Sequence, residues 1–230
     1  MQLFQSTDKL FGIINNNYNL LPVFNRFGIH PGFKDKTVEQ VCKEKNINKD
    51  FFLALINTYN NPDYFPEEEL KSFSPLLIVD YLKKTHAYYL LYFLPKIERL
   101  LSKLVSSNIE TNSEFKMIVS FFENYKKELI IHIKDEEDNV FPHVINFVQD
   151  HQKSNIKNTP ISFEKEHSNV EMKLSDLKNL LIKYLEPVYD NNDFNEFVSS
   201  LYQFEKDIID HARIEDHILV SQIKELKKLT

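Results

Sequence analysis

The sequence predicts an all-α protein, an antiparallel up-down four-helix bundle over residues 74–228 preceded by a small helical domain over residues 1–66. Long amphipathic stretches rich in Leu, Ile, Lys, Glu and Phe favour helices. Only three glycines occur in 230 residues, which argues against Gly-rich phosphate loops and hairpin-rich β folds. Short polar connections between the long helical patterns favour antiparallel neighbours.

The composition and charge indicate which classes of protein and of partner are expected for this chain. The chain is 42% hydrophobic and 27% charged, which is typical of a globular protein. Its net charge of −6, with basic residues interspersed among acids, predicts no nucleic-acid partner. We expect no membrane partner, because no apolar run approaches ~18 residues. The start of the chain lacks a basic segment followed by an apolar one, and Cys42 is the single cysteine, so we expect a cytoplasmic protein without an intrachain disulfide.

The first sixty residues predict short helices. Thr7 or Asp8 is expected to cap a helix running through Leu20, with residues 22–31 interrupting it because they begin and end with proline. Residues 27–33, which include Gly28 and Gly32, are expected to form a turn.

Two further helix starts are marked in this region. Thr37-Val-Glu-Gln40 has the form of a capping box and predicts a short helix through Cys42. Asn48 is expected to cap the next helix, which carries Phe51 and Phe52. A unit of this size buries little surface alone, so we expect it to pack against the rest of the chain.

Residues 61–66 form the predicted linker, because Pro62 and Pro66 cannot lie inside an unbroken helix. Ser74-Pro75 predicts the start of the bundle, with Ser74 as N-cap and Pro75 at the first helical position. Four long helices are expected from there, with Pro95 kinking the first. Their predicted ranges are 75–105, 113–148, 160–188 and 193–228.

Each of these helices carries one histidine on its apolar stripe, at a position where leucine would be expected. These histidines are His86, His132, His167 and His211. Glu136 and Glu215 follow His132 and His211 by four residues, so each pair lies on one helix face. Burying two ionised carboxylates in a bundle core is costly unless a cation compensates them. The pattern therefore predicts a dinuclear metal centre and assigns no catalytic residue.

The donor set favours iron. Six mixed nitrogen and oxygen ligands around two ions suit octahedral metals with an open position, whereas zinc prefers four ligands. Manganese is compatible with the same donors.

The same residues carry a family resemblance. His86, His132-x-x-x-Glu136, His167 and His211-x-x-x-Glu215 resemble the hemerythrin-like, HHE-type di-iron bundles, most closely the repair-of-iron-centres proteins. The resemblance covers residues 74 to about 225 with specific motifs and residues 10–60 only loosely. It implies two iron ions with an oxo or hydroxo bridge, the four histidines as terminal ligands, and Glu136 and Glu215 as bridging ligands.

The chain departs from that family in two places. The family commonly has adjacent cysteines in its N-terminal domain, whereas residues 28–32 here read Gly-Ile-His-Pro-Gly. The segment from Glu136 to Pro142 ends in Val-Phe-Pro and resembles the family's segment ending in Leu-Phe-Pro, but the segment after Glu215 has no Phe-Pro ending.

Several residues near the predicted ligands allow two interpretations. Tyr89 and Tyr125 either hydrogen-bond the ligands or fill core space, and Glu166 either hydrogen-bonds or gates the site or faces solvent. His143 is an extra ligand or, as we favour, lies too far along the helix. Glu137 is expected to be solvated, and Cys42 to be a small core residue.

The resemblance implies a stress-response function. The protein would supply iron to damaged iron–sulfur clusters in client proteins or handle nitric oxide. The alternative is an oxygen or redox sensor that signals through its N-terminal domain, and a third class is a purely structural metal site. The expected partners are a small diatomic ligand, oxygen or nitric oxide, and iron–sulfur proteins. The sequence does not predict the oligomeric state.

Overall fold

The computed structural model describes residues 3–106, 113–152, 167–186 and 189–228, although the side chains of residues 151–152, 167–172 and 227–228 are outside this description. The chain divides into two compact units, which are described in turn. One comprises residues 1–84 with 213–230, and the other comprises residues 85–212.

The start of the first unit differs from expectation. Helix α1 spans Leu10–Asn16, a 3₁₀ turn η1 spans Tyr18–Leu20 and α2 spans Leu21–Arg26. The predicted single helix through Leu20 is therefore wrong. Asn17 takes an extended conformation and its side chain accepts a hydrogen bond from Asn19 N, which ends α1 and starts the turn. Pro22 does not interrupt a helix but lies in the first turn of one, where its missing N–H costs nothing.

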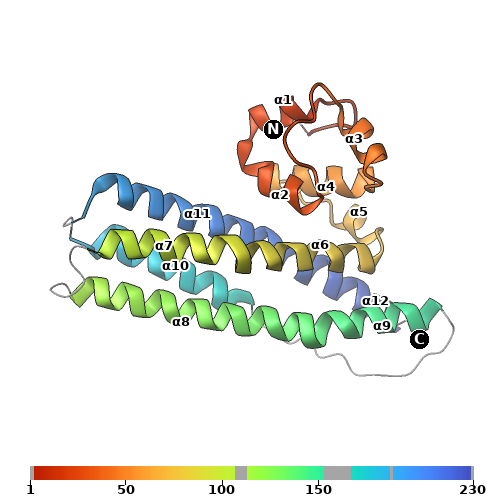
Figure 1. Ribbon diagram of the computed structural model, residues 1–230. Helices are drawn as coiled ribbons and strands as arrows, with labels where there is room; N and C mark the ends of the chain where they lie inside the picture. The colour runs from red at the N-terminus through yellow and green to blue at the C-terminus, as the bar shows by residue number, and fades with distance from the viewer. Residues whose placement is uncertain (1–2, 107–112, 153–166, 187–188, 229–230) are drawn as a thin grey trace. The chain divides into compact units, whose positions relative to one another are not determined.

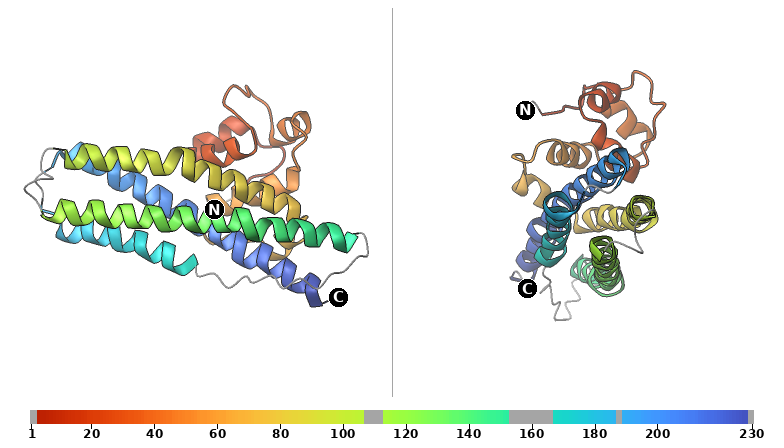
Figure 2. Two further views of the ribbon diagram at one scale, coloured as in Figure 1. Left: turned by 60° about the horizontal axis from the view of Figure 1, so that its bottom comes forward. Right: turned by 90° about the vertical axis from the view of Figure 1, so that its left-hand side faces the viewer.

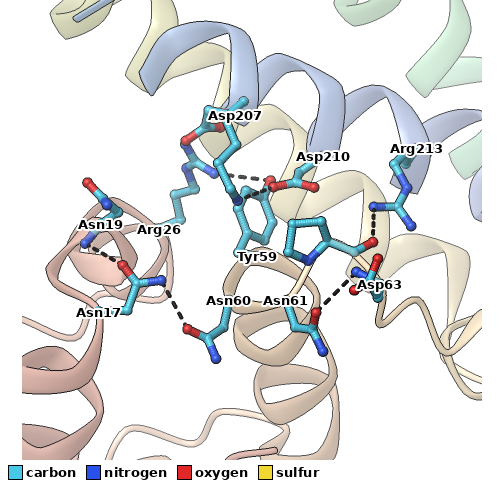
Figure 3. Close-up of polar contacts among 12 residues, drawn as sticks. Asn17, Asn19, Arg26, Tyr59, Asn60, Asn61, Asp63, Asp207, Asp210 and Arg213 are labelled. Atoms are coloured by element: carbon cyan, nitrogen blue, oxygen red, sulfur yellow. Dashed lines mark hydrogen bonds and ion pairs between the residues drawn. The ribbon is translucent and has the colours of Figure 1, made fainter. Parts of the chain in front are cut away.

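The next two helices begin as predicted. Helix α3, Val38–Glu44, has the reciprocal capping box between Thr37 and Gln40. Helix α4, Lys49–Asn60, is capped by the Asn48 side chain, which accepts from Phe51 N. Figure 3 shows Asn17 of the first turn donating to the Asn60 side chain at 3.0 Å, which ties the end of α4 to the start of the unit.

Residues 61–66 are not helical, and the short helix α5, Glu67–Lys71, follows them. This stretch is held by the C-terminal part of the same unit. The Arg213 guanidinium donates to the Pro62 carbonyl at 3.4 Å (Figure 3) and lies 4.4 Å from the centre of the Phe65 ring. The buried Gln222 amide donates to the carbonyls of Lys71 and Phe73, both at 2.7 Å.

The long helices of the second unit form the predicted bundle. Helices α7 (Leu94–Val105), α8 (Ser113–Asp135), α10 (His167–Tyr184) and α11 (Asn191–Ile214) run side by side in Figures 1 and 2. The third helix ends at Tyr184 rather than at 188, because Pro187 disfavours helical backbone in the residue before it. Its expected start, residues 160–166, lies outside the described residues. No helix in the described ranges is long and apolar enough to cross a membrane.

The bundle core is aromatic and aliphatic. Phe93, Phe122, Tyr125, Phe197 and Phe204 are among its buried members. The rings of Phe93 and Phe204 stack with centroids 4.9 Å apart, and Tyr89 meets Phe204 edge-on at 5.3 Å. Tyr89 and Phe93 lie in the middle of the first long helix, Phe197 and Phe204 in α11, and Phe122 and Tyr125 in α8, so the core packs these three helices against one another.

Ion pairs join each neighbouring pair of helices around this core. Lys126 of α8 reaches Glu98 of α7 at 2.7 Å, and Lys103 of α7 reaches Asp193 of α11 at 2.6 Å. Two further pairs connect α8 with α10 and α10 with α11, and these are Lys173 with Glu128 and Lys178 with Glu205. Each exposed pair adds little stability, but together they oppose a shift in helix register.

Three of the long helices contain a π-helical segment, which the sequence reasoning did not predict. The segments are η2 (Tyr89–Phe93), η3 (Glu136–Val140) and η4 (Glu215–Val220), and each is followed by an α-helix, which is α7, α9 (Phe141–Gln152) and α12 (Ser221–Lys228) respectively. Pro95 lies in the first turn of α7 after a π segment, so the chain from α6 (Pro75–Tyr88) to α7 contains a π turn at the position where a proline kink was expected. Such segments frequently occur at functional sites.

Cys42 is buried among core residues, and we expect it to be unreactive in the folded protein. Burial raises the pKa of its thiol from 9.0 to about 11, although the nearby Lys49 opposes the shift. The thiolate fraction at pH 8 should then fall about 100-fold, and iodoacetamide should label Cys42 only after unfolding. Since the folded-state pKa is raised, this group should destabilise the fold only as pH rises from about 9 to about 11. Labelling of the native protein at the rate of a free thiol would contradict this prediction.

Candidate metal centre

Helices α6, α8 and α11 bring the described part of the site together. His86 lies near the end of α6, His132 near the end of α8 and His211 near the end of α11. Glu136 opens the π segment that follows α8. The apolar stripes turn these residues inward, and His86, Glu136 and His211 are all buried.

The ring nitrogens and carboxylate oxygens converge on one another. His86 Nε2 lies 3.2 Å from His211 Nε2 and 3.3 Å from Glu136 Oε2. The second oxygen, Glu136 Oε1, lies 2.8 Å from His132 Nε2. One carboxylate therefore contacts imidazoles from two different helices, as a bridging ligand would.

Glu215 follows His211 by one turn on the same continuous helix and opens the π segment η4. Its carboxylate belongs to a buried group with His86, Glu136 and His211, in which one ligand atom from each residue lies within 4.8 Å of all the others. Each glutamate predicted to bridge thus begins a π segment, which widens the helix where its side chain turns inward.

This donor set fits a metal ion better than a network of hydrogen bonds. A neutral imidazole has one N–H and one lone pair, and a carboxylate has only lone pairs. The His86 Nε2 atom faces a second imidazole nitrogen and a carboxylate oxygen, so acceptors accumulate at this point. A cation would be stabilised by all of them, and mixed imidazole and carboxylate donors suit iron, manganese or zinc.

The two tyrosines named from the sequence lie in different surroundings. The Tyr89 ring meets His211 edge-on at 5.7 Å, and its hydroxyl donates to Asp207 Oδ1 at 2.7 Å. Tyr89 therefore contacts a predicted ligand through its ring, while its hydroxyl bonds to Asp207. Tyr125 is buried in the bundle core, with its ring perpendicular to Phe204 at 6.5 Å.

The structure describes only one of three other residues considered from the sequence, which are His167, Glu166 and His143, in full. His167 is the first residue of α10, and its side chain lies outside the described part of the chain. Glu166 also lies outside the described residues. His143 is exposed and lies in α9, after η3 along the chain.

Glu137 is a site residue that the sequence reasoning missed. It was expected to be solvated, but its carboxylate Oε1 lies 3.2 Å from His86 Nδ1 and its side chain is 34% exposed. In a regular helix the neighbour of an inward-facing residue points well away from it. The signal in the sequence that could have indicated this contact is the pair of consecutive glutamates after a histidine. The π segment explains how both glutamates can reach the same imidazole ring.

A small cavity adjoins the histidines. It has a volume of about 20 Å³ and is lined by three histidines, one tyrosine and apolar side chains. The lining residues are His86, Tyr89, Leu129, His132, Ile133, Ile208, His211 and Ala212. This volume accommodates about one water-sized molecule.

The comparison with protein families agrees with this geometry. The family model described as the hemerythrin HHE cation binding domain matches residues 77–223. No curated protein and no solved structure matches the chain. The matched range includes every predicted ligand, and the buried His and Glu residues form a cluster within it. The chain therefore belongs to the hemerythrin HHE cation-binding family, and its bundle is a metal-binding module.

Proposed function

We propose that the bundle holds two iron ions and serves the response to nitrosative and oxidative stress. In this function it supplies iron to damaged iron–sulfur clusters or handles nitric oxide. The observation that carries the proposal is the buried group of His86, Glu136, His211 and Glu215 beside a cavity of about 20 Å³. We assign His132 and His167 as further ligands, with all four histidines terminal and the two glutamates bridging.

Two features of the site support this function. Leu129, Ile133, Ile208 and Ala212 give the cavity apolar walls, which suit a small uncharged ligand such as oxygen or nitric oxide. The His132 side chain is 16% exposed, whereas those of His86 and Glu136 are 0% and 1% exposed. An edge of the centre near solvent gives iron a route of release, which a repair function requires. When bound, the iron would supply redox chemistry at an exchangeable coordination position.

The repair function is tested with an iron–sulfur enzyme whose clusters have been damaged. Iron-loaded protein should restore its activity, and the His132→Ala variant should not, because it lacks the most exposed of the described ligands. His143→Ala is the matched control, since it removes an exposed histidine and should leave repair unchanged. Equal repair by the His132→Ala variant would overturn the proposal. Metal that leaves only on unfolding would instead support a structural site.

The cavity is tested by filling it. Ala212→Leu adds three carbon atoms to its wall and should slow nitric oxide or oxygen binding by roughly tenfold, about 1.4 kcal/mol, without loss of metal. Ala87→Leu makes the same change at an exposed position near His86 and should have no effect. The measurement is the rate of the absorbance change when gas is added to anaerobic, iron-loaded protein. Unchanged binding by the Ala212→Leu variant would show that the ligand enters elsewhere.

The second candidate function is a sensor of oxygen or redox state that signals through the N-terminal helices. A specific observation favours it. The π segment η4, which begins with Glu215, packs against α5 within the first unit. The Phe65 ring lies 6.0 Å from the His217 ring of η4. Gln222, just beyond this segment, donates to the carbonyls of Lys71, the last residue of α5, and of Phe73. A shift of Glu215 on binding metal would therefore be transmitted to α5.

The sensor function is tested by amide hydrogen exchange in residues 67–71. Metal loading or oxidation should change exchange there about 5- to 150-fold, the range of ordinary allosteric coupling. Gln222→Ala should reduce this response, whereas Lys224→Ala at an exposed position should not. Identical exchange in all metal and oxidation states would exclude signalling through α5.

A further inference from the structure

The carboxylates of Glu136 and Glu137 face the two nitrogens of one imidazole ring, that of His86. Glu136 Oε2 lies 3.3 Å from His86 Nε2, and Glu137 Oε1 lies 3.2 Å from His86 Nδ1. His86 is fully buried, so its ring makes these contacts away from bulk water. The ring is also held from its face, because Phe141 stacks on it with centroids 5.5 Å apart and planes 14° apart.

These two contacts with His86 depend on the π segment. Consecutive residues of a regular α-helix point about 100° apart, so both would not be expected to reach one ring on a neighbouring helix. Glu136 and Glu137 are the first two residues of η3, where the helix is wider. Phe141 begins the α-helix directly after this segment, so one short stretch supplies three contacts to His86.

The contact to Glu137 decides which nitrogen of His86 can bind a metal. An ionised carboxylate only accepts hydrogen bonds, so Nδ1 must carry the proton that it receives. The lone pair of the neutral ring then lies on Nε2, which faces His211 Nε2 and Glu136. A carboxylate that accepts from a metal-ligating histidine orients the ring and raises its basicity.

We propose that Glu137 is a positioning residue, which holds His86 in the orientation and tautomer that bind metal through Nε2. This inference rests on the assignment of His86 as a ligand. It gives Glu137 a role distinct from that of its neighbour Glu136, which contacts the metal-facing side of the ring. Glu137 acts from behind the ring.

The metal test uses anaerobic Fe²⁺ binding by the full chain. Glu137→Ala should weaken binding about 10- to 100-fold, the usual effect of removing such a partner, with an unchanged number of ions at saturation. Glu137→Gln should lose less, because its amide oxygen can still accept from Nδ1. Asp138→Asn changes an adjacent, exposed carboxylate and should bind as the unmodified protein does. Wild-type affinity in the Glu137→Ala variant would overturn the inference, and so would a loss of bound ions equal to that in His86→Ala, which would make Glu137 a ligand.

A second readout needs no metal. Two-bond ¹H–¹⁵N spectra of the apo protein should show a proton on His86 Nδ1, and Glu137→Ala should lower the occupancy of that proton while thermal unfolding stays cooperative. A His86 ring protonated at Nε2 alone in the unmodified protein would overturn the inference. If the unmodified protein binds no Fe²⁺ but shows the Nδ1 tautomer, the proposed iron function fails and the contact of Glu137 remains.

Discussion

The bundle buries negative charge, which a bound cation would compensate. Glu136 and Glu215 are almost fully buried, and their carboxylates converge with two imidazoles within 4.8 Å. Taking an ionised carboxylate out of water costs several kcal/mol unless an opposite charge lies beside it. The surrounding features keep these donors in place. The aromatic core packs the helices, the perimeter ion pairs oppose changes of register, and the π segments turn the glutamates inward.

The sequence could predict the bundle and four members of the buried group, because both follow from spacing on a helix. Steps of three and four residues mark the stripes, and a histidine or glutamate on such a stripe must face the core. The capping signals at Thr37, Asn48 and Ser74 are equally local, and each starts a helix in the structure. At these three positions the residue type and its neighbours in the sequence are sufficient to predict where a helix begins.

The missed features depend on contacts between distant residues or on small changes of helical pitch. Nothing in Glu136-Glu137-Asp138 states that the helix widens there, so Glu137 was assigned to solvent. The break after α1 follows from the extended backbone at Asn17, whose side chain also bonds to Asn60 43 residues away. The helix after Glu215 also makes contacts that are distant in sequence. Gln222, in the helix that follows η4, donates to two carbonyls near α5, so this helix end carries a contact with the N-terminal segment.

The burial of the lone thiol has a chemical consequence for a protein exposed to reactive nitrogen or oxygen species. Nitrosating agents and peroxides modify thiolates fastest, and this chain carries one cysteine, enclosed in its helical N-terminal unit. Cys42 of the folded chain should therefore resist S-nitrosation and sulfenic acid formation, and mixed disulfides should form at this position only after unfolding.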